Sequence, residues 1–271
     1  MCELTVAKDH VTRMLLDYHM HTQFSDGRSE LNKYVEEAMR KRLGEIGFSD
    51  HIYLQKESWS MDFSDLPRYV SSISEISASS QISIKKGLEV DFVPNRMDNL
   101  MQIISGFDFD YLIGSVHHVG NWLIDSERHI EEWRRRDVDQ AYGQYFSLVQ
   151  EMANTRLFDI VGHLDLAKKF NFRPKSDLKD LMLETVKTLA KSGMCIEINT
   201  GGLRRTCREI YPSRELLRMC FENGLPITLG SDAHSPEHVG ADLEKAVSLA
   251  KEVGYSEIAQ FSKRKRSFVP L

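Results

Sequence analysis

Two histidines one residue apart, His19 and His21, follow a short apolar segment near the start of the chain. Because alternate side chains of a β-strand lie on the same face, a strand at this point would direct both imidazoles the same way. Imidazole and carboxylate groups together are suitable ligands for zinc, iron or manganese. The spacing therefore indicates part of a metal site, and the remaining ligands have to come from other segments.

Histidines and acidic residues also follow other apolar segments of the chain. Six of the histidines stand where a predicted strand ends: His19, His21, His51, His117, His163 and His234. Glu89 and Asp232 are the best carboxylate candidates, because each ends a strand between small or apolar residues, where a buried acid without a partner is costly. Asp26 could reach the same place from the loop after His21, although an Asp before Gly27 is also typical of a turn.

About nine candidate ligands are too many for one tetrahedral ion, so two or three metal ions are expected. A carboxylate that bridges two ions about 3.5–4 Å apart is a usual way to hold a hydroxide nucleophile, since metal binding lowers the pKa of water towards about 7. For Glu89, an ion pair with a lysine such as Lys86 is the alternative to a cation. The cysteines, Cys2, Cys195, Cys207 and Cys220, form no CxxC pair and are expected to be reduced thiols.

Composition limits the class of protein. The chain has 271 residues, of which 41% are hydrophobic, and no Pro/Gly/Ser-rich linker divides it, so residues 1–271 are expected to form one domain. The formal net charge of -5 offers no basic field for nucleic acid or an anionic membrane, which favours a small-molecule partner. No apolar stretch approaches the roughly 18 residues that span a bilayer, and no secretory signal is evident. We expect a cytoplasmic protein.

Short apolar segments alternate with longer amphipathic segments along the whole chain. Strands are expected over 13–18, 45–49, 82–88, 111–116, 158–162, 194–198 and 227–230. Helices are expected over 29–42, 64–79, 96–106, 129–155, 177–192, 213–223 and 236–253. A strand followed by a helix, repeated about seven times, predicts a parallel sheet with helices outside it. Because nearly every predicted strand ends in a His, Asp or Glu, and functional groups of a β/α barrel gather at the C-terminal ends of its strands, we favour a closed barrel.

The ordered motifs are similar to those of a known family. The segments "DYHMHTQFSDG", "FSDHI", "GLEVDF", "DYLIGSVHHV", "DIVGHLDLAKKF", "EINTGGLRR" and "PITLGSDAHSPEHVG" resemble the PHP (polymerase and histidinol phosphatase) superfamily, most closely its histidinol-phosphate phosphatase branch. The resemblance runs from about Leu16 to Gly240. It implies a single-domain α/β fold, a distorted (β/α)7 barrel, with a metal site at the C-terminal ends of the strands.

The resemblance also implies how three divalent ions would be held. His19 and His21 would bind the first metal with Glu89 and Asp232. Glu89 would bridge to a second metal that His117 and His163 bind. The third metal would be bound by Asp26, His51 and His234, of which Asp26 is the position that varies within the family.

The activity implied is phosphomonoester hydrolysis of L-histidinol phosphate, a step of histidine biosynthesis, with a metal-bridging hydroxide as nucleophile. Cations at the barrel mouth would offset the charge of the phosphate. Glu89 and Asp232 are the candidate catalytic residues, and the proton for the leaving group could come from Asp232 or from a water on a metal.

Positive side chains are expected to complete the phosphate site, and the candidates are Arg204, Arg205 and Lys168. One of the two arginines is expected to face away. The ammonium and imidazole of histidinol call for acidic or aromatic neighbours, for which the candidates are Asp91, Trp122, Asp125 and Glu127.

Three alternatives use the same barrel. A PHP-type nuclease or 3'-phosphatase would require a basic groove, which the net charge does not favour. A protein-tyrosine phosphatase would require only a wider opening at the end of the barrel. A non-enzymatic metal-binding module would be expected to lack some of the candidate metal ligands. His/Asp/Glu sites accept several divalent metals, among them zinc, iron and manganese.

Overall fold

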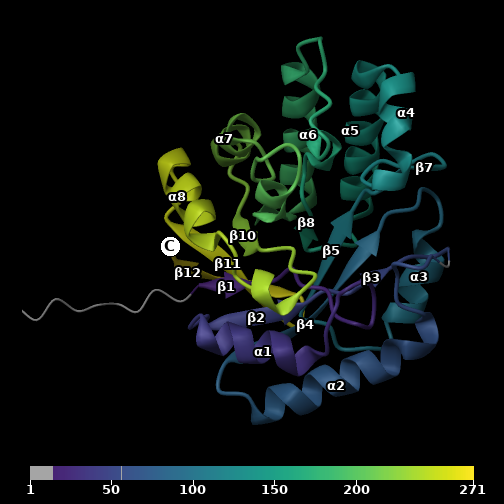
Figure 1. The fold of residues 1–271 in the computed structure, drawn as a ribbon. Coiled ribbons are helices and arrows are strands. Elements are labelled where there is room, and N and C mark those ends of the chain that lie inside the picture. The colour runs from purple at the N-terminus through teal and green to yellow at the C-terminus, as the bar shows by residue number, and fades with distance from the viewer. Residues whose placement is uncertain (1–14, 56) are drawn as a thin grey trace, which may run out of the picture.

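The computed structural model describes residues 15–55 and 57–271, and its centre is a nearly closed barrel of parallel strands (Figure 1). The strands follow the order β1-β2-β4-β5-β8-β9-β10. Their bounds are β1 Leu16–Asp17, β2 Glu45–Phe48, β4 Ser83–Asp91, β5 Tyr111–Ser115, β8 Ile160–Val161, β9 Cys195–Asn199 and β10 Ile227–Gly230. The Tyr18 amide donates to the Leu229 carbonyl at 3.0 Å and Met20 forms a parallel bridge with Ala233, so the first and last strands meet. The predicted (β/α)7 barrel is confirmed.

Helices surround this barrel, as Figure 1 shows. They are α1 Leu31–Arg40, α2 Leu66–Ser79, α3 Met97–Ile104, α4 Ile130–Arg135, α5 Val138–Thr155, α6 Lys179–Ser192, α7 Arg214–Glu222 and α8 Leu243–Val253. Each bears buried apolar residues that pack inward, and the first turn of α7 is capped by Ser213, which accepts from the Leu216 amide at 3.4 Å. Among the described residues, no helix has the length and apolar character needed to cross a membrane.

Two expected helices are interrupted. The segment 129–155 was predicted as one helix, but Arg136 is extended (φ -97°, ψ 159°) between α4 and α5. Asp137 then caps α5 by accepting from the Gln140 amide at 3.1 Å, because an Asp side chain can satisfy an amide that the helix leaves unpaired. The segment 236–253 likewise divides into a 3₁₀ turn, Pro236–His238, and α8. The expected strand residues 13 and 14, like Cys2, lie outside the described residues.

Five further strands were not predicted. β3 His51–Ile52 pairs with β4, β6 His118–Val119 pairs with β7 Trp122–Leu123, and β11 Glu257–Ser262 forms an antiparallel hairpin with β12 Lys265–Pro270. The β11–β12 hairpin packs against the N-terminal ends of the barrel strands: Phe261 donates its amide to the Tyr18 hydroxyl at 3.2 Å, and Lys263 donates its amide to Asp110 at 3.0 Å. It therefore covers the end of the barrel opposite the C-terminal ends of the strands.

The barrel interior is filled by aromatic rings. Tyr111 stacks on Tyr18 with ring centroids 4.9 Å apart and donates its hydroxyl to the Tyr18 carbonyl at 2.7 Å. A Cβ added to Gly47 or Gly87 would lie 2.2 or 2.3 Å from the Tyr111 ring or hydroxyl, so both strands need glycine here. This packed layer gives a rigid base to the C-terminal end of the barrel.

Candidate metal centre

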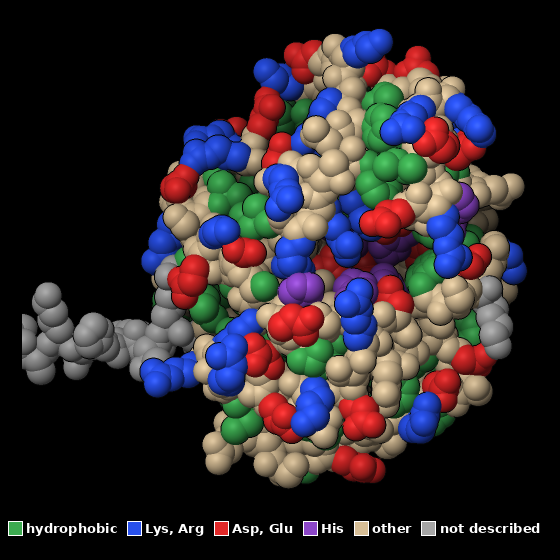
Figure 2. Space-filling model, in the orientation of Figure 1, with side chains coloured by type: hydrophobic (Ala, Val, Ile, Leu, Met, Phe, Trp, Pro, Cys, Tyr) green, Lys and Arg blue, Asp and Glu red, His purple; other side chains and the backbone are tan. Residues whose placement is uncertain are grey.

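A pocket opens at the C-terminal end of the barrel, where Figure 2 shows histidines gathered in a hollow that charged side chains surround. The cavity measures about 390 Å³, within the range of small-molecule sites. Seven of the nine predicted metal ligands line it: Asp26, His51, Glu89, His117, His163, Asp232 and His234. The other two, His19 and His21, are fully buried beside them. The fold therefore brings all nine together.

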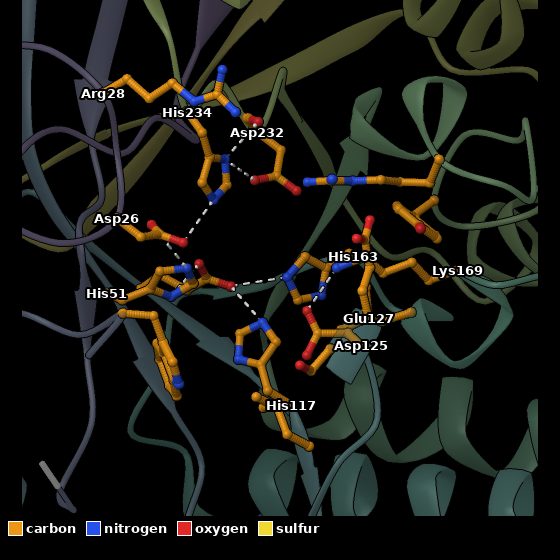
Figure 3. A pocket seen from close by; sticks show the side chains of 17 residues that line it. Asp26, Arg28, His51, His117, Asp125, Glu127, His163, Lys169, Asp232 and His234 are labelled. Carbon is orange, nitrogen blue, oxygen red and sulfur yellow. Dashed lines mark hydrogen bonds and ion pairs between the residues drawn. The ribbon is translucent and has the colours of Figure 1, made fainter. Parts of the chain in front are cut away.

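Glu89, on β4, lies at the centre of this cluster. Figure 3 shows the imidazoles of His117 and His163 pointing towards the same place in the pocket. Glu89 Oε1 is 2.9 Å from His163 Nε2 and 3.6 Å from His117 Nε2. Its Oε2 is 3.0 Å from His19 Nε2 and from His51 Nδ1, and 3.4 Å from His21 Nε2. Each carboxylate oxygen thus faces a different group of imidazoles, which is the arrangement that a bridging ligand requires. No lysine takes the place of a cation among the ion pairs described for Glu89.

Asp232 and Asp26 occupy the other side of the cluster. Asp232 Oδ1 is 3.4 Å from His234 Nδ1 and 3.5 Å from His21 Nε2. Asp26 Oδ2 is 3.4 Å from His234 Nε2, and its Oδ1 is 3.8 Å from His51 Nε2. Asp26 therefore bends back from its loop towards the histidines, as the sequence suggested.

Two of these residues have backbone conformations that most side chains avoid. Asp232 has a φ of 55° and His163 a φ of 24°. Such conformations cost about 1–3 kcal/mol and persist where the surrounding structure demands them, often at functional sites. Here they turn the side chains at the ends of β8 and β10 into the pocket.

The ligand atoms form four overlapping groups that could hold a metal ion. They are His21/Asp26/His51/His234, His19/His163/Asp232, His19/His21/Glu89 and His51/Glu89/His117. The set proposed for the third metal lies together in the first of these groups, with His21 added. His163 and His117, expected on one ion, fall into separate groups, although both approach the same oxygen of Glu89. The division of ligands among the ions remains a proposal.

The chemistry of the donors fits divalent cations. Burial, with His51 and His234 nearby, lowers the pKa of His21 to about 3, so its imidazole is neutral at neutral pH. Within the described part of the chain, neither buried ring nitrogen of His21 has a hydrogen-bond partner, as expected if His21 is a metal ligand. Burial opposes ionisation of Glu89, but His19 and His51 outweigh it and hold the pKa of this carboxyl well below its usual range. For His19, His51 and His117 the neighbouring carboxylates outweigh burial and raise the imidazole pKa, that of His117 to about 10, so these rings would release a proton when they bind a metal.

Several buried acids that support the cluster were not identified from the sequence. Asp50 accepts from the amides of Thr22 at 2.7 Å and Ser25 at 3.1 Å, which shapes the loop that carries Asp26. Glu197, in the middle of β9, accepts from the His19 ring. An acid inside an otherwise apolar strand, as in "CIEIN", is the signal that could have revealed Glu197.

The predicted phosphate-binding cations are only partly placed at the pocket. Arg205 lines the cavity. Arg204 turns away and donates to the backbone carbonyls of Ser231 and Asp232, the latter at 3.2 Å. Lys168 lies outside the lining: its ammonium is buried against Asp165 at 2.8 Å and the Ile210 carbonyl at 2.8 Å, so the prediction that it contacts phosphate does not fit the structure. The 3₁₀ turn directs Lys168 inward.

Two lining cations were not predicted, Arg28 and Lys169. Lys169 pairs with Asp125 at 2.9 Å. Asp125 and Glu127 line the pocket, as expected of residues that could contact histidinol, and Trp59 and Tyr211 add aromatic faces.

The other two histidinol-contact candidates lie elsewhere. Trp122 packs against Trp133, with ring centroids 4.7 Å apart. Asp91 is buried behind the pocket, where it accepts from the His117 amide at 3.1 Å and contacts His118 Nδ1 at 2.8 Å. Asp91 therefore orients His117 rather than lining the cavity.

The chain is similar to known proteins over most of its length. A family model described as "PHP domain" matches residues 17–201. The chain is 33% identical over 246 residues to a probable histidinol-phosphatase of Deinococcus radiodurans, covering 89% of this chain and 94% of that protein. It is 31% identical over 259 residues to a histidinol-phosphatase of Lactococcus lactis, covering 91% and 94% respectively.

The fold also has a solved counterpart. The crystal structure of histidinol phosphate phosphatase from Lactococcus lactis, complexed with zinc, L-histidinol and phosphate, superposes with a TM-score of 0.83 at 28% identity. The match covers 93% of this chain and 98% of that one.

Proposed function

The chain belongs to the PHP domain family, and from that premise we propose that it is a metal-dependent phosphomonoesterase that hydrolyses L-histidinol phosphate to L-histidinol and phosphate. The central position of Glu89, with one oxygen towards each of two groups of histidines, is the observation that carries this proposal. The related enzymes named histidinol-phosphatase, and the neighbour that binds zinc, L-histidinol and phosphate, support the choice of substrate. In this role residues 1–271 act as one catalytic domain in cytoplasmic histidine biosynthesis.

Three divalent ions, zinc, iron or manganese, would be held by the nine residues of the cluster. His19, His21, Glu89 and Asp232 would bind the first, Glu89 with His117 and His163 the second, and Asp26, His51 and His234 the third. Divalent cations supply Lewis acidity: they lower the pKa of water and offset the charge of a phosphate ester. The presence of two or more imidazoles near each carboxylate supports more than one ion.

The chain's own residues would bind and orient the substrate. Arg205, with Arg28 and Lys169 nearby, offers guanidinium and ammonium groups to the phosphate oxygens. Glu127 and Asp125 offer carboxylates to the ammonium or imidazole of histidinol. Asp232, at the edge of the cavity, is ionised, because His19 and the neighbouring histidines outweigh burial and hold its pKa well below its usual range. It would accept a proton from the attacking water and pass it to the leaving alcohol, while Glu89 would hold the cluster together.

A comparison of kcat/KM among four substrates tests this function. The purified protein is assayed with L-histidinol phosphate, p-nitrophenyl phosphate, a phosphotyrosine peptide and the diester bis-p-nitrophenyl phosphate. We expect kcat/KM for L-histidinol phosphate to exceed the others by orders of magnitude. A preference for the diester would support a nuclease instead, and a preference for the peptide would support a protein-tyrosine phosphatase.

A further inference from the structure

Glu197 lies below the pocket and is not one of the nine candidate ligands. It is 1% exposed, in the middle of β9, and it does not line the cavity. Its two oxygens accept three hydrogen bonds. Oε1 is 2.5 Å from His19 Nδ1, and Oε2 accepts from the His163 amide at 2.8 Å and from Asn199 Nδ2 at 3.1 Å. Besides its own strand, this buried carboxylate contacts the segments that follow β1 and β8.

The contact with His19 selects one form of that ring. His19 Nε2 lies 3.0 Å from Glu89 and 3.9 Å from Asp232, on the side where a metal would bind. A ligand nitrogen must carry no proton, so the proton of a neutral His19 has to be on Nδ1. Glu197 accepts that proton in a hydrogen bond, and this fixes both the tautomer and the rotation of the ring.

The same carboxylate also reaches the ends of β8 and β10. It holds the amide of His163, whose φ of 24° turns its imidazole towards Glu89. Asn199, which donates to Glu197, places its Nδ2 3.4 Å from Asp232 Oδ2. One side chain thus connects ligands that the proposed function assigns to two different ions.

Strand β10 leaves space for the contact between Glu197 and His19. A Cβ on Gly230 would lie 2.0 Å from Glu197 Oε1 and 2.7 Å from the Cβ of His19. Any side chain at position 230 would therefore push Glu197 and His19 apart. The absence of a side chain on β10 at this point is required for the contact.

We propose that Glu197 is a positioning residue that sets the metal affinity of the centre by holding His19 and His163 in their ligating orientations. This inference rests on the proposed function, since it assumes that the nine residues bind metal. Glu197 touches neither metal nor substrate and acts through the two histidines.

The test is zinc binding by the Glu197→Gln variant. All three hydrogen-bond donors point at the carboxylate oxygens of Glu197. The side-chain amide of Gln has an NH₂ group in place of one oxygen, so at least one of the three hydrogen bonds must be lost. We expect zinc affinity, measured by competition with a chromophoric chelator, to fall about 10–100-fold, as for other residues that orient metal-bound histidines. Circular dichroism and thermal unfolding report whether the variant folds.

Glu45→Gln is the matched control. Glu45 is also a buried carboxylate of the barrel, but it lies at the start of β2, where it contacts Tyr18, Ser83 and Lys85. We expect this variant to lose stability and to keep wild-type zinc affinity. If Glu197→Gln bound zinc as tightly as wild type, the proposal would be wrong while the proposed function would stand. If wild type bound no zinc or other divalent ion, both would fail.

A second measurement does not depend on the variant folding. In the zinc-loaded wild-type protein, ¹⁵N-resolved NMR of the imidazoles should show a proton on Nδ1 of His19, shifted downfield by its short contact with a carboxylate. A His19 that carries its proton on Nε2, or none on either nitrogen, contradicts the role of Glu197.

Discussion

Glu89 is the residue whose charge matters most to the cluster. Converting it to Gln keeps its size but removes the charge that faces five histidines and, in the proposed site, two cations. We expect Glu89→Gln to lose at least one metal equivalent and nearly all phosphatase activity, with little change in thermal stability. Elemental analysis beside thermal unfolding measures this; full metal occupancy with a near-normal rate would exclude the bridging role.

The two neighbouring arginines are expected to differ in function. Arg205→Ala should raise KM and weaken inhibition by inorganic phosphate. The expected loss of binding free energy is about 1.5–3 kcal/mol, the size of a hydrogen bond to a charged group. Arg204→Ala removes the donor to the Ser231 and Asp232 carbonyls, so we expect lower stability and weaker metal binding instead. Steady-state kinetics and metal titration of both variants separate the two effects. Equal KM values in wild type and Arg205→Ala would mean that Arg205 does not contact the phosphate.

For single residues, the sequence predicted which residues belong to the site better than it predicted where their side chains point. All nine candidate ligands lie together because each lies at, or in the loop after, the C-terminal end of a strand of one barrel. The direction of a side chain within a short turn is harder to read, and for this reason Lys168 was expected in the pocket while Lys169 lines it. Acids such as Asp50 and Glu197 were missed because their role depends on which neighbouring strand they face, and that is known only from the fold.

Among the elements, the parallel strands were predictable to within a few residues, because buried strands are short apolar segments between helices. The break between α4 and α5 was not, since an Asp within an amphipathic helix is ordinary until its capping contact is seen. The β11–β12 hairpin was missed too. Its turn residues Lys263 and Arg264 have φ values of 49° and 64°, but they are not the Asn-Gly or Asp-Gly pair that signals such a turn.

The contact between β4 and Tyr111 allows a test of barrel packing. A Cβ at Gly87 would lie 2.3 Å from the Tyr111 ring, so Gly87→Ala should destabilise the protein by about 1–3 kcal/mol through overpacking. Gly143→Ala is the control: in α5 an added Cβ meets nothing within 4 Å, and alanine favours helix by about 0.5–1 kcal/mol. Chemical denaturation measures both, and a Gly87→Ala protein as stable as wild type would mean that the ring moves freely.

For the whole molecule, bound metal should contribute to stability as well as to catalysis. Ions that bind only the folded state stabilise it by about 2.7 kcal/mol at a concentration one hundred times Kd. We expect exhaustive chelation to abolish phosphatase activity and lower Tm, and added zinc or manganese to restore both. Unchanged activity and Tm after chelation, with metal analysis confirming removal, would contradict a metal-dependent enzyme.

The closure of the barrel between its first and last strands has a consequence for biosynthesis. Asp17 accepts from the amide and hydroxyl of Ser231, a contact across 214 positions of the chain. His19 and His21 therefore emerge from the ribosome long before Asp232 and His234, and the two halves of the ligand cluster meet only after β10 and the residues that follow it have been synthesised. Closing so long a loop is entropically costly and slow compared with local folding. A nascent or prematurely terminated chain that lacks Asp232 and His234 thus presents an incomplete set of ligands, and selective metal uptake is delayed until these two residues have been synthesised.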